Sequence, residues 1–316
     1  MTSLPGGGQA PRERDARRGG GPAPIVVEAD RRLAAQVRGL AARRMVFLAG
    51  LPGTGKSLLV HQVAHVAAAT GRTVHLLQWD VARPVFEASP AGRRYPLAGG
   101  VTHAVIRRAA GLWVRRAIAA WHDRHRGAEH LLVGETPFAG NRFVELARQL
   151  DDAAELLLAA PDCRFAIAVP SVEVRRFLEA ERERRAAQPR HPREREDAPP
   201  EVLRALWRDL ARVATHLGIA PAGGAREDPM GDGTPPPYDP DVYRRVYAAV
   251  LRHRHVEAVA LEVILPTGAF SVYDFATPPR DLTPGEAEAE AGIAQVERDH
   301  PDPAALERAV ARWWEV

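Results

Sequence analysis

The residues best suited to chemistry stand together in one short stretch, GLPGTGKS at positions 50–57. Their spacing fits G-x-x-x-x-G-K-[ST], a pattern in which glycines let backbone N–H groups converge on phosphate oxygens. In this pattern the lysine, Lys56, reaches the outer phosphates, and the hydroxyl that follows it, Ser57, binds Mg²⁺. The residues expected to contact the phosphates are Leu51, Pro52, Gly53, Thr54, Gly55, Lys56, Ser57 and Leu58.

Lys56 is the only lysine of the chain, because the other 42 of the 43 Lys and Arg residues are arginines. A compact ammonium fits inside a tight loop, where a planar guanidinium is too wide. The chain therefore uses lysine only where the phosphate-binding pattern requires it. This favours a site for a nucleoside triphosphate, with ATP and Mg²⁺ as ligands, over an accidental glycine-rich turn.

The flanking sequence predicts the strand, loop and helix that phosphate binding requires. An apolar run at residues 44–49 is typical of a buried parallel strand. Residues 57–70 are predicted to form a helix that stops at Gly71. Because a helix N-terminus carries a positive dipole end, this helix would support an anion at the loop. We therefore interpret residues 50–57 as a P-loop, or Walker A motif.

A carboxylate follows the next predicted strand, at residues 73–79. Asp80 would lie at the ligand-binding edge of an open α/β sheet, and Arg83 follows within a turn. Asp80 is the candidate general base for an acceptor hydroxyl, with Glu87 as the alternative, and Arg83 is the candidate for binding the acceptor's charge or the transferring phosphoryl group. A helix cap next to a surface arginine is the structural alternative.

A second carboxylate, Glu135, ends the strand expected at residues 129–135. This is the position of a Walker B acid, which holds Mg²⁺ or positions a nucleophile, so Ser57 and Glu135 are the candidate metal ligands. A plain acid at a strand end is the alternative. Asn141 and Arg142, in the loop that follows, could also face the site.

A fourth buried strand is expected at residues 163–169, starting at Cys163, the single cysteine, which we interpret as a buried thiol. Two helices, at residues 171–185 and 201–217, follow with an arginine-rich segment between them. This arrangement favours a lid whose arginines close over a polyphosphate. A solvated helical hairpin with i,i+4 ion pairs is the alternative.

The rest of the chain predicts further elements. Glycine, proline and arginine at residues 1–24 predict a disordered tail. His122, His125 and His130 have no acidic partner at metal-ligand spacing, so they are expected to be surface histidines. The other expected elements are helices at residues 25–43, 99–125, 241–254, 283–298 and 302–314, a loop insertion at 219–240, a fifth strand at 256–265 and its hairpin partner at 270–274.

Composition narrows the function classes. The net charge of the 316 residues is +3, and the arginines are scattered among acids, so nucleic acid is not an expected partner. No apolar run reaches the ~18 residues of a membrane span, and the N-terminus lacks the apolar stretch of a signal peptide. A soluble, cytoplasmic protein is expected.

Strands alternating with helices predict a three-layer α/β/α fold with a five-stranded, mainly parallel sheet. The chain resembles the P-loop kinases, the nucleoside and nucleotide kinase-like group of P-loop NTPases. The resemblance covers roughly residues 40–265 and rests on the loop at 50–57, Asp80 with Arg83, Glu135, and a lid-like segment containing Arg182, Arg184 and Arg185.

The resemblance implies a function and a domain organisation. It implies ATP- and Mg²⁺-dependent phosphoryl transfer to a small hydroxyl-bearing acceptor such as a nucleoside, nucleotide or metabolite, with Asp80 as base and Arg182 as the leading lid contact. The expected domains are a kinase-like domain at residues 25–275, with its lid at 170–218, and a C-terminal helical extension at 276–316. Gly134-Glu135-Thr136 stands where deoxynucleoside kinases have Glu-Arg-Ser, so the sequence leaves the acceptor open.

Other P-loop classes can be compared with the sequence. A GTPase of the usual kind needs Asn-Lys-x-Asp, which cannot occur because Lys56 is the only lysine. An AAA+ ATPase is expected to carry Asp-Glu after its third strand, whereas this chain has Gly134-Glu135. A RecA-like ATPase and a non-catalytic, nucleotide-gated regulator with a partner surface remain the alternatives.

Overall fold

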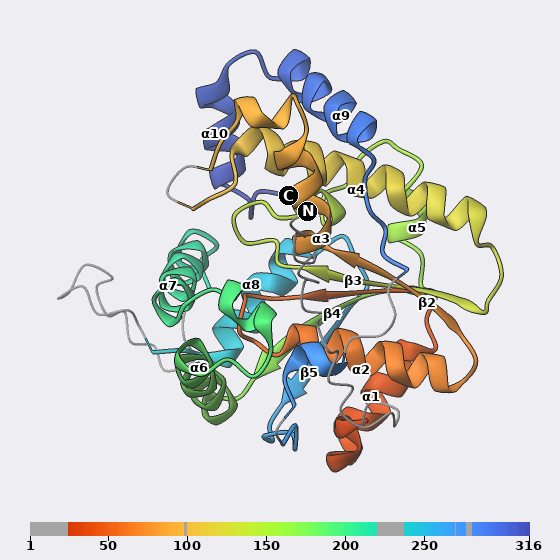
Figure 1. The fold of residues 1–316 in the computed structure, drawn as a ribbon, viewed down its shortest axis with the longest axis vertical. Helices are drawn as coiled ribbons and strands as arrows, with labels where there is room; N and C mark the ends of the chain where they lie inside the picture. The colour runs from red at the N-terminus through yellow and green to blue at the C-terminus, as the bar shows by residue number, and fades with distance from the viewer. Residues whose placement is uncertain (1–24, 98–99, 220–236, 269, 276–279) are drawn as a thin grey trace, which may run out of the picture.

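The computed structural model describes residues 25–97, 100–219, 237–268, 270–275 and 280–316 (Figure 1). The tail predicted at residues 1–24 and most of the insertion predicted at 219–240 lie outside the described residues. The chain is an α/β protein with a five-stranded sheet in the order β2-β3-β1-β4-β5, and every pairing is parallel. The strands are β1 Met45–Ala49, β2 Thr73–Gln78, β3 His130–Thr136, β4 Cys163–Pro170 and β5 Val256–Leu261.

Helices cover both faces of the sheet, as Figure 1 shows, with α1 and α2 on one side and α3, α4 and α9 on the other. The α-helices are α1 Arg31–Ala41, α2 Lys56–Ala69, α3 Trp79–Ala88, α4 Ala104–Arg124, α5 Glu155–Leu158, α6 Val172–Ala187, α7 Pro200–His216, α8 Pro240–Val250, α9 Glu286–Asp299 and α10 Pro303–Ala311. Short 3₁₀ turns include η3 Val144–Leu146, η4 Pro192–Glu196 and η5 Val272–Phe275.

The central strand β1 is buried along its whole length. Because successive side chains of a strand point to opposite faces, Val46 joins the apolar core under α1 and α2, whereas Phe47 joins the core under α4 and α8. A strand buried on both faces needs apolar residues at every position, which is why this run is continuous rather than alternating. The expected α/β architecture with a parallel sheet is therefore confirmed.

The C-terminal helices belong to the larger of these two cores. Ile293 of α9 and Val310 of α10 are buried in the core that also contains residues of α4. Trp313 is buried there as expected, and Trp314 packs against the same core in a partly buried position. The segment before α9 covers the outer edge of β2, where Leu76 exchanges backbone hydrogen bonds with Arg280 and Leu282. Such cover removes an exposed strand edge.

The end of the fifth strand was predicted wrongly. β5 stops at Leu261, which pairs with Pro170, the last residue of β4. β4 ends at Pro170 and the chain enters α6 after Ser171, so the apolar residues 263–265 have no β4 residue to pair with and leave the sheet. The expected hairpin partner at residues 270–274 forms the 3₁₀ turn η5 instead, in which the Asp274 carboxylate accepts a hydrogen bond from the Ser271 N–H at 2.7 Å.

Cys163 begins β4 as a buried free thiol, as expected, and burial raises the pKa of this thiol to about 12. The histidine prediction was wrong. His122, His125 and His130 are all half-buried, whereas a surface position for each had been expected, and His125 and His130 form ring contacts with buried His75. Among the described residues, no helix is long and apolar enough to cross a membrane.

Candidate functional site

A cavity of about 550 Å³ lies at the carboxyl end of the sheet. The glycine-rich loop (residues 50–57), the start of α3, β3 and the loop after it, the helix α6 with η4, and the segment after β5 all line it. This volume is typical of a site for a small ligand, and the carboxyl edge of a parallel sheet is where such folds bind ligands.

The glycine-rich loop links β1 to α2 through glycines in the left-handed region. Gly53 has a φ of 74° and Gly55 a φ of 85°. A Cβ at Gly53 would come within 2.8 Å of Leu203 of α7, so α7 approaches the loop closely. Gly55 is the N-cap of α2 and provides no side-chain cap. The first N–H groups of α2 therefore lack a side-chain acceptor at the cavity, which is the arrangement that binds anions.

The loop presents most of its predicted phosphate contacts to the cavity. The residues of the prediction that line the cavity are Pro52, Gly53, Gly55, Lys56, Ser57 and Leu58. Leu51 and Thr54 do not line it and are buried. The Leu51 N–H donates to the Tyr243 hydroxyl at 3.1 Å, so this amide is already paired within the protein. The prediction that Leu51 contacts phosphate is therefore not supported by the geometry.

Lys56 is almost fully buried beneath the loop. Its Nζ donates to the Leu51 carbonyl at 2.8 Å and lies 3.5 Å from Oε1 of Glu135. Burial lowers the pKa of Lys56, and the Glu135 carboxylate opposes this shift. The ammonium thus lies at the cavity with the Glu135 carboxylate as its ion-pair partner.

Ser57 and Glu135 lie side by side, as expected for a shared metal site. The Ser57 hydroxyl donates to Oε2 of Glu135 at 3.2 Å. Glu135 is held there by the sheet, since β3 pairs it with Leu48 of β1, two residues before the loop. A hydroxyl and a carboxylate are the oxygen ligands that Mg²⁺ prefers, so this donor pair fits that ion.

Asp80 faces the same cavity from the second position of α3, which begins at Trp79, directly after β2. The Asp80 side chain is exposed on the side of the cavity, and the protein atoms that line the cavity lie around it. Partial desolvation and the nearby Glu135 raise the pKa of Asp80, against the opposite influence of Arg83. A carboxylate with a raised pKa in a cleft is a stronger base than a free one.

Glu87, the alternative base, is engaged elsewhere. Its carboxylate accepts hydrogen bonds from Arg83 at 3.1 and 3.2 Å and from the Thr102 hydroxyl at 3.0 Å. Arg83 and Thr102 line the cavity and Glu87 does not. Glu87 therefore fits the role of positioning Arg83 better than that of a base.

Of the two candidate site residues in the loop after β3, only Arg142 lines the cavity. Burial lowers the pKa of Arg142, while Asp80 opposes that shift. Asn141 is buried with its amide 3.3 Å from Glu145, so it does not face the site. Phe138, Asn141 and Phe143 all have φ near 60°, a left-handed conformation that costs free energy in non-glycine residues.

Arginines of α6 and η4 line the opposite wall of the cavity. Arg182 donates to the Ala198 carbonyl at 2.9 Å and lies 3.4 Å from Asp197. Arg185 and Arg193 also line the cavity, whereas Arg184 does not and its side chain is 58% exposed. Of the three arginines predicted as lid contacts, the structure therefore brings Arg182 and Arg185 to the site.

An apolar wall completes the cavity, and sequence reasoning missed it. Phe177 and Leu178 of α6 face it, together with Val263, Ile264 and Phe270 after β5. The last three side chains are between 41% and 49% exposed, which is high for large apolar groups. Residues 263–265 read as a continued strand in the sequence, so their signal was hidden. Apolar side chains left exposed in a cleft indicate a binding surface.

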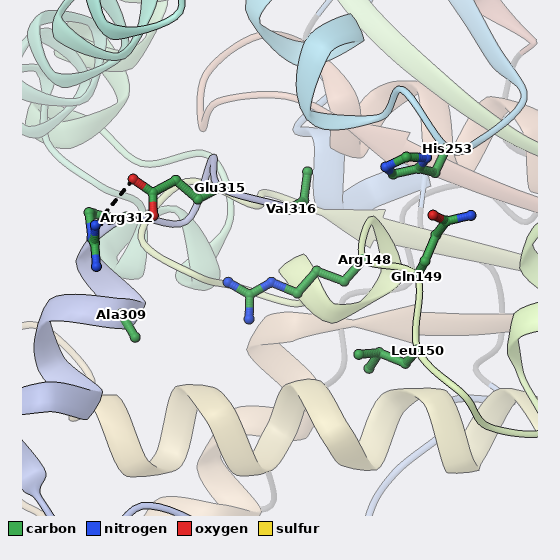
Figure 2. A pocket seen from close by; sticks show the side chains of 8 residues that line it. All are labelled: Arg148, Gln149, Leu150, His253, Ala309, Arg312, Glu315 and Val316. Atoms are coloured by element: carbon green, nitrogen blue, oxygen red, sulfur yellow. Dashed lines mark hydrogen bonds and ion pairs between the residues drawn. The ribbon is translucent and has the colours of Figure 1, made fainter.

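A second cavity, of about 510 Å³, lies away from this site near the C-terminus (Figure 2). Figure 2 shows that Arg312 faces Glu315, while Gln149, Leu150 and His253 lie on the opposite side of the opening. None of its lining residues belongs to the glycine-rich loop or is a predicted site residue. We therefore assign the candidate chemistry to the first cavity.

Comparison of this chain with protein-family models, with curated proteins and with solved structures gives no match.

Proposed function

We propose that this protein is an ATP- and Mg²⁺-dependent phosphotransferase that acts on a small hydroxyl-bearing acceptor. The observation that carries the proposal is the convergence of the glycine-rich loop, the Lys56–Glu135–Ser57 contacts and Asp80 on one cavity. Phosphate binding, metal ligands and a candidate base are the parts that phosphoryl transfer requires.

In this proposal the glycine-rich loop holds the polyphosphate. The uncapped N–H groups at the start of α2 donate to phosphate oxygens, and the Lys56 ammonium neutralises charge on the outer phosphates. Ser57 and Glu135 hold Mg²⁺, which supplies charge neutralisation at the phosphate oxygens when it is bound. Lys56 would exchange its hydrogen bond to the Leu51 carbonyl for a phosphate oxygen.

Asp80 acts as the general base. An acceptor hydroxyl oxygen forms a bond to the γ-phosphorus, the bond from that phosphorus to the β–γ bridging oxygen breaks, and Asp80 takes the hydroxyl proton. Position supports this role, because Asp80 lies at the carboxyl edge of the sheet, lines the cavity together with Arg182 and Arg185, and is close enough to Glu135 to feel its charge. The products are the phosphorylated acceptor and ADP.

Arg142, Arg182 and Arg185 line the cavity, and in this proposal they neutralise the negative charge that spreads over the transferring group. Guanidinium groups placed in advance around such a position stabilise the transition state without further reorganisation. The apolar wall of Phe177, Ile264 and Phe270 supplies a surface for the flat face of a base. The charged and apolar halves of the cavity thus match the two halves of a nucleotide.

A plain ATPase, or a nucleotide-gated regulator, is the second candidate function. Both would use the loop, Lys56, Ser57 and Glu135 in the same way, and the ion pairs that hold α6 to η4 are compatible with either. Neither requires a base at the position of Asp80. The role of Asp80 therefore separates the candidates.

The proposal is tested by mixing the purified protein with Mg·ATP and pools of nucleosides, nucleotides, sugars and small metabolites. Mass spectrometry then searches for a compound heavier by one phosphoryl group. Such a product, absent with Lys56→Ala and strongly reduced with Asp80→Asn, supports the phosphotransferase and names its acceptor. ATP loss without a phosphorylated product, at equal rate in Asp80→Asn, overturns it in favour of an ATPase.

A further inference from the structure

Three histidines meet at the far end of β2 and β3 from the cavity. His75 lies in β2, His130 begins β3, and His125 is the C-cap of α4. One ring nitrogen from each lies within 4.8 Å of the other two. His130 precedes Glu135 by five residues of strand, which is roughly 16 Å at 3.3 Å per residue, so the cluster is separate from the candidate active site.

The fold explains why these side chains meet. In the parallel register His130 pairs with Thr73 and Leu132 pairs with His75, so His75 and His130 point to the same face of the sheet. That face is covered by α4, whose Trp121 contacts the His75 ring edge-on at 5.7 Å between centroids. His125 follows from the end of the same helix, and its ring centroid lies 4.4 Å from that of His75 and 4.6 Å from that of His130.

One pair of ring nitrogens, from His75 and His130, is spaced as two ligands of one tetrahedral ion are. Nε2 of His75 lies 3.2 Å from Nδ1 of His130. Two nitrogens bound to Zn²⁺ at about 2.05 Å with a tetrahedral angle lie about 3.3 Å apart. The ring nitrogens of His125 have no hydrogen-bond partner within the described part of the chain, although the ring contacts both other histidines. A neutral imidazole carries one nitrogen lone pair, so each of the three rings can offer one to a shared ion once the hydrogen bond between His75 and His130 opens.

We propose that His75, His125 and His130 bind one divalent cation of the zinc class, with water in the fourth position. Neutral imidazole nitrogens favour Zn²⁺, Co²⁺, Ni²⁺ or Cu²⁺ over Mg²⁺ and Ca²⁺, which prefer oxygen ligands. Glu129 favours the required tautomer, because its carboxylate, 3.5 Å from Nε2 of His130, attracts a proton to that nitrogen and leaves the lone pair on Nδ1, the atom that contacts His75. Metal-bound histidines are commonly oriented by such a carboxylate.

Two arginines hold the backbone that carries His130. Arg44 donates to the carbonyls of Gly127 and His130, and Arg72 donates to those of Ala128 and His130. These contacts fix the turn before β3, so the ligands are positioned in advance. The positive charges of Arg44 and Arg72 disfavour a nearby cation, so we expect weaker metal binding here than at a zinc site built from thiolates. The bound ion would join the end of α4 to the starts of β2 and β3.

The test uses untagged full-length protein, treated with EDTA and free of nucleotide. Equilibrium dialysis measures Zn²⁺ binding, and Co²⁺ absorption spectra report the ligand geometry. We expect one ion per chain with a tetrahedral Co²⁺ spectrum. His125→Ala and His130→Ala should each weaken binding at least tenfold, and Glu129→Gln should weaken it about 10-fold to 100-fold.

Two matched variants make the result specific. His122→Ala removes a histidine one turn earlier on α4 and should bind as the wild type does. Glu135→Gln removes the metal ligand proposed at the cavity and should also retain the Zn²⁺ ion. His125 and Glu129 are at least partly exposed, so we expect variants at these positions to fold. Circular dichroism of each variant verifies this. No Zn²⁺ or Co²⁺ binding by the wild type, or unchanged binding by folded His125→Ala and His130→Ala, overturns the proposal.

Discussion

The Lys56 ammonium lies 3.5 Å from one oxygen of the Glu135 carboxylate, while the other oxygen accepts a hydrogen bond from Ser57 at 3.2 Å. This contact joins the first residues of α2 to β3 across the sheet. Lys56 is buried, and an unpaired buried ammonium would be costly, so Glu135 keeps the loop's only cation charged and in place. The same carboxylate is thus both the partner of Lys56 and the proposed metal ligand.

Lys56→Met is expected to abolish nucleotide binding without unfolding the protein. Burial lowers the pKa of Lys56, which means that the charged form is disfavoured in the folded state. Removing this charge at neutral pH should leave the melting temperature unchanged or raise it. The wild type, by contrast, should gain about 2.7 kcal/mol of unfolding free energy at Mg·ATP concentrations of 100 Kd.

Thermal unfolding with and without Mg·ATP measures both effects. Lys56→Arg keeps the charge but places a wide guanidinium in a tight loop, so it should also lose the ATP-dependent rise. An ATP-dependent rise of wild-type size in Lys56→Met would show that phosphate does not bind at this loop.

Asp80→Asn is expected to lower the rate of phosphoryl transfer by about 10²–10⁴-fold while ATP binding is retained, because the variant lacks a base but keeps the loop. The matched control is Glu87→Gln, whose parent carboxylate is engaged by Arg83 and Thr102. Glu87→Gln should lose less activity than Asp80→Asn. We expect its loss to arise only because Arg83 is held less firmly in position. Equal losses in the two variants would contradict the assignment of Asp80 as base.

The raised pKa of Asp80 also predicts a pH dependence. The folded state disfavours the ionised carboxylate, so this group costs stability above its folded pKa, and the cost is lost as the pH falls from that pKa towards the unfolded value of 3.8. Asp80→Asn should therefore melt slightly higher than the wild type at pH 7 and lose this advantage in acid. Wild-type transfer should fall as acid protonates Asp80. A transfer rate that is independent of pH through this range would argue against a carboxylate base.

Arg182→Gln is expected to lower the turnover number more than it changes the KM for ATP. Its guanidinium lines the cavity, and arginines that stabilise a transferring phosphoryl group contribute about 10³–10⁵ in rate. Arg184→Gln, on the same helix but outside the cavity lining, is the matched control and should retain activity. Steady-state kinetics of both variants decide whether α6 acts as a catalytic lid or only as a wall.

Glu155 is expected to be a main determinant of acid stability. It accepts hydrogen bonds from Arg115 and Arg254, whose side chains are 1% and 0% exposed. Burial alone would raise the pKa of Glu155, but these hydrogen bonds outweigh it and lower the pKa to about 2. A lowered folded pKa means that the contribution is present above the unfolded value of 4.5 and is lost as the pH falls towards 2.

Denaturant unfolding of Glu155→Ala should therefore show a loss of about 3–5 kcal/mol at pH 7, because two buried guanidinium groups lose a shared partner. Asp209→Ala breaks an exposed pair with Arg212 and should cost less than about 1 kcal/mol. Similar losses in the two variants would show that the buried network does not govern stability.

The sequence was informative where local patterns determine structure. The loop at residues 50–57, its strand and its helix follow from glycine spacing and apolar runs, and the convergence of Asp80 with Glu135 follows from parallel topology. The contact between Leu51 and Tyr243 was not predictable, because the two residues are 192 positions apart and no local pattern links them. His75 was missed for the same reason, since only the register of β2 with β3 brings it to His130.

Errors arose where tertiary contacts overrode a local pattern. The apolar residues 263–265 favour a strand, but β4 ends at Pro170 and the chain turns into α6, which leaves them no β4 residue to pair with. Asn141 is polar and follows a strand, yet the left-handed turn places it in the interior beside Glu145. Pattern reasoning cannot distinguish these cases, because it contains no information on which partners remain available.

The most direct measurement follows the γ-phosphoryl group of ATP in the presence of the acceptor found by mass spectrometry. The amounts transferred to the acceptor and released as inorganic phosphate are measured for the wild type, Asp80→Asn and Lys56→Met. The account predicts that the wild type places most of the group on the acceptor, that Asp80→Asn loses this transfer while still binding ATP, and that Lys56→Met neither binds nor transfers. Release of the whole group as inorganic phosphate by the wild type, at a rate that Asp80→Asn leaves unchanged, would contradict it.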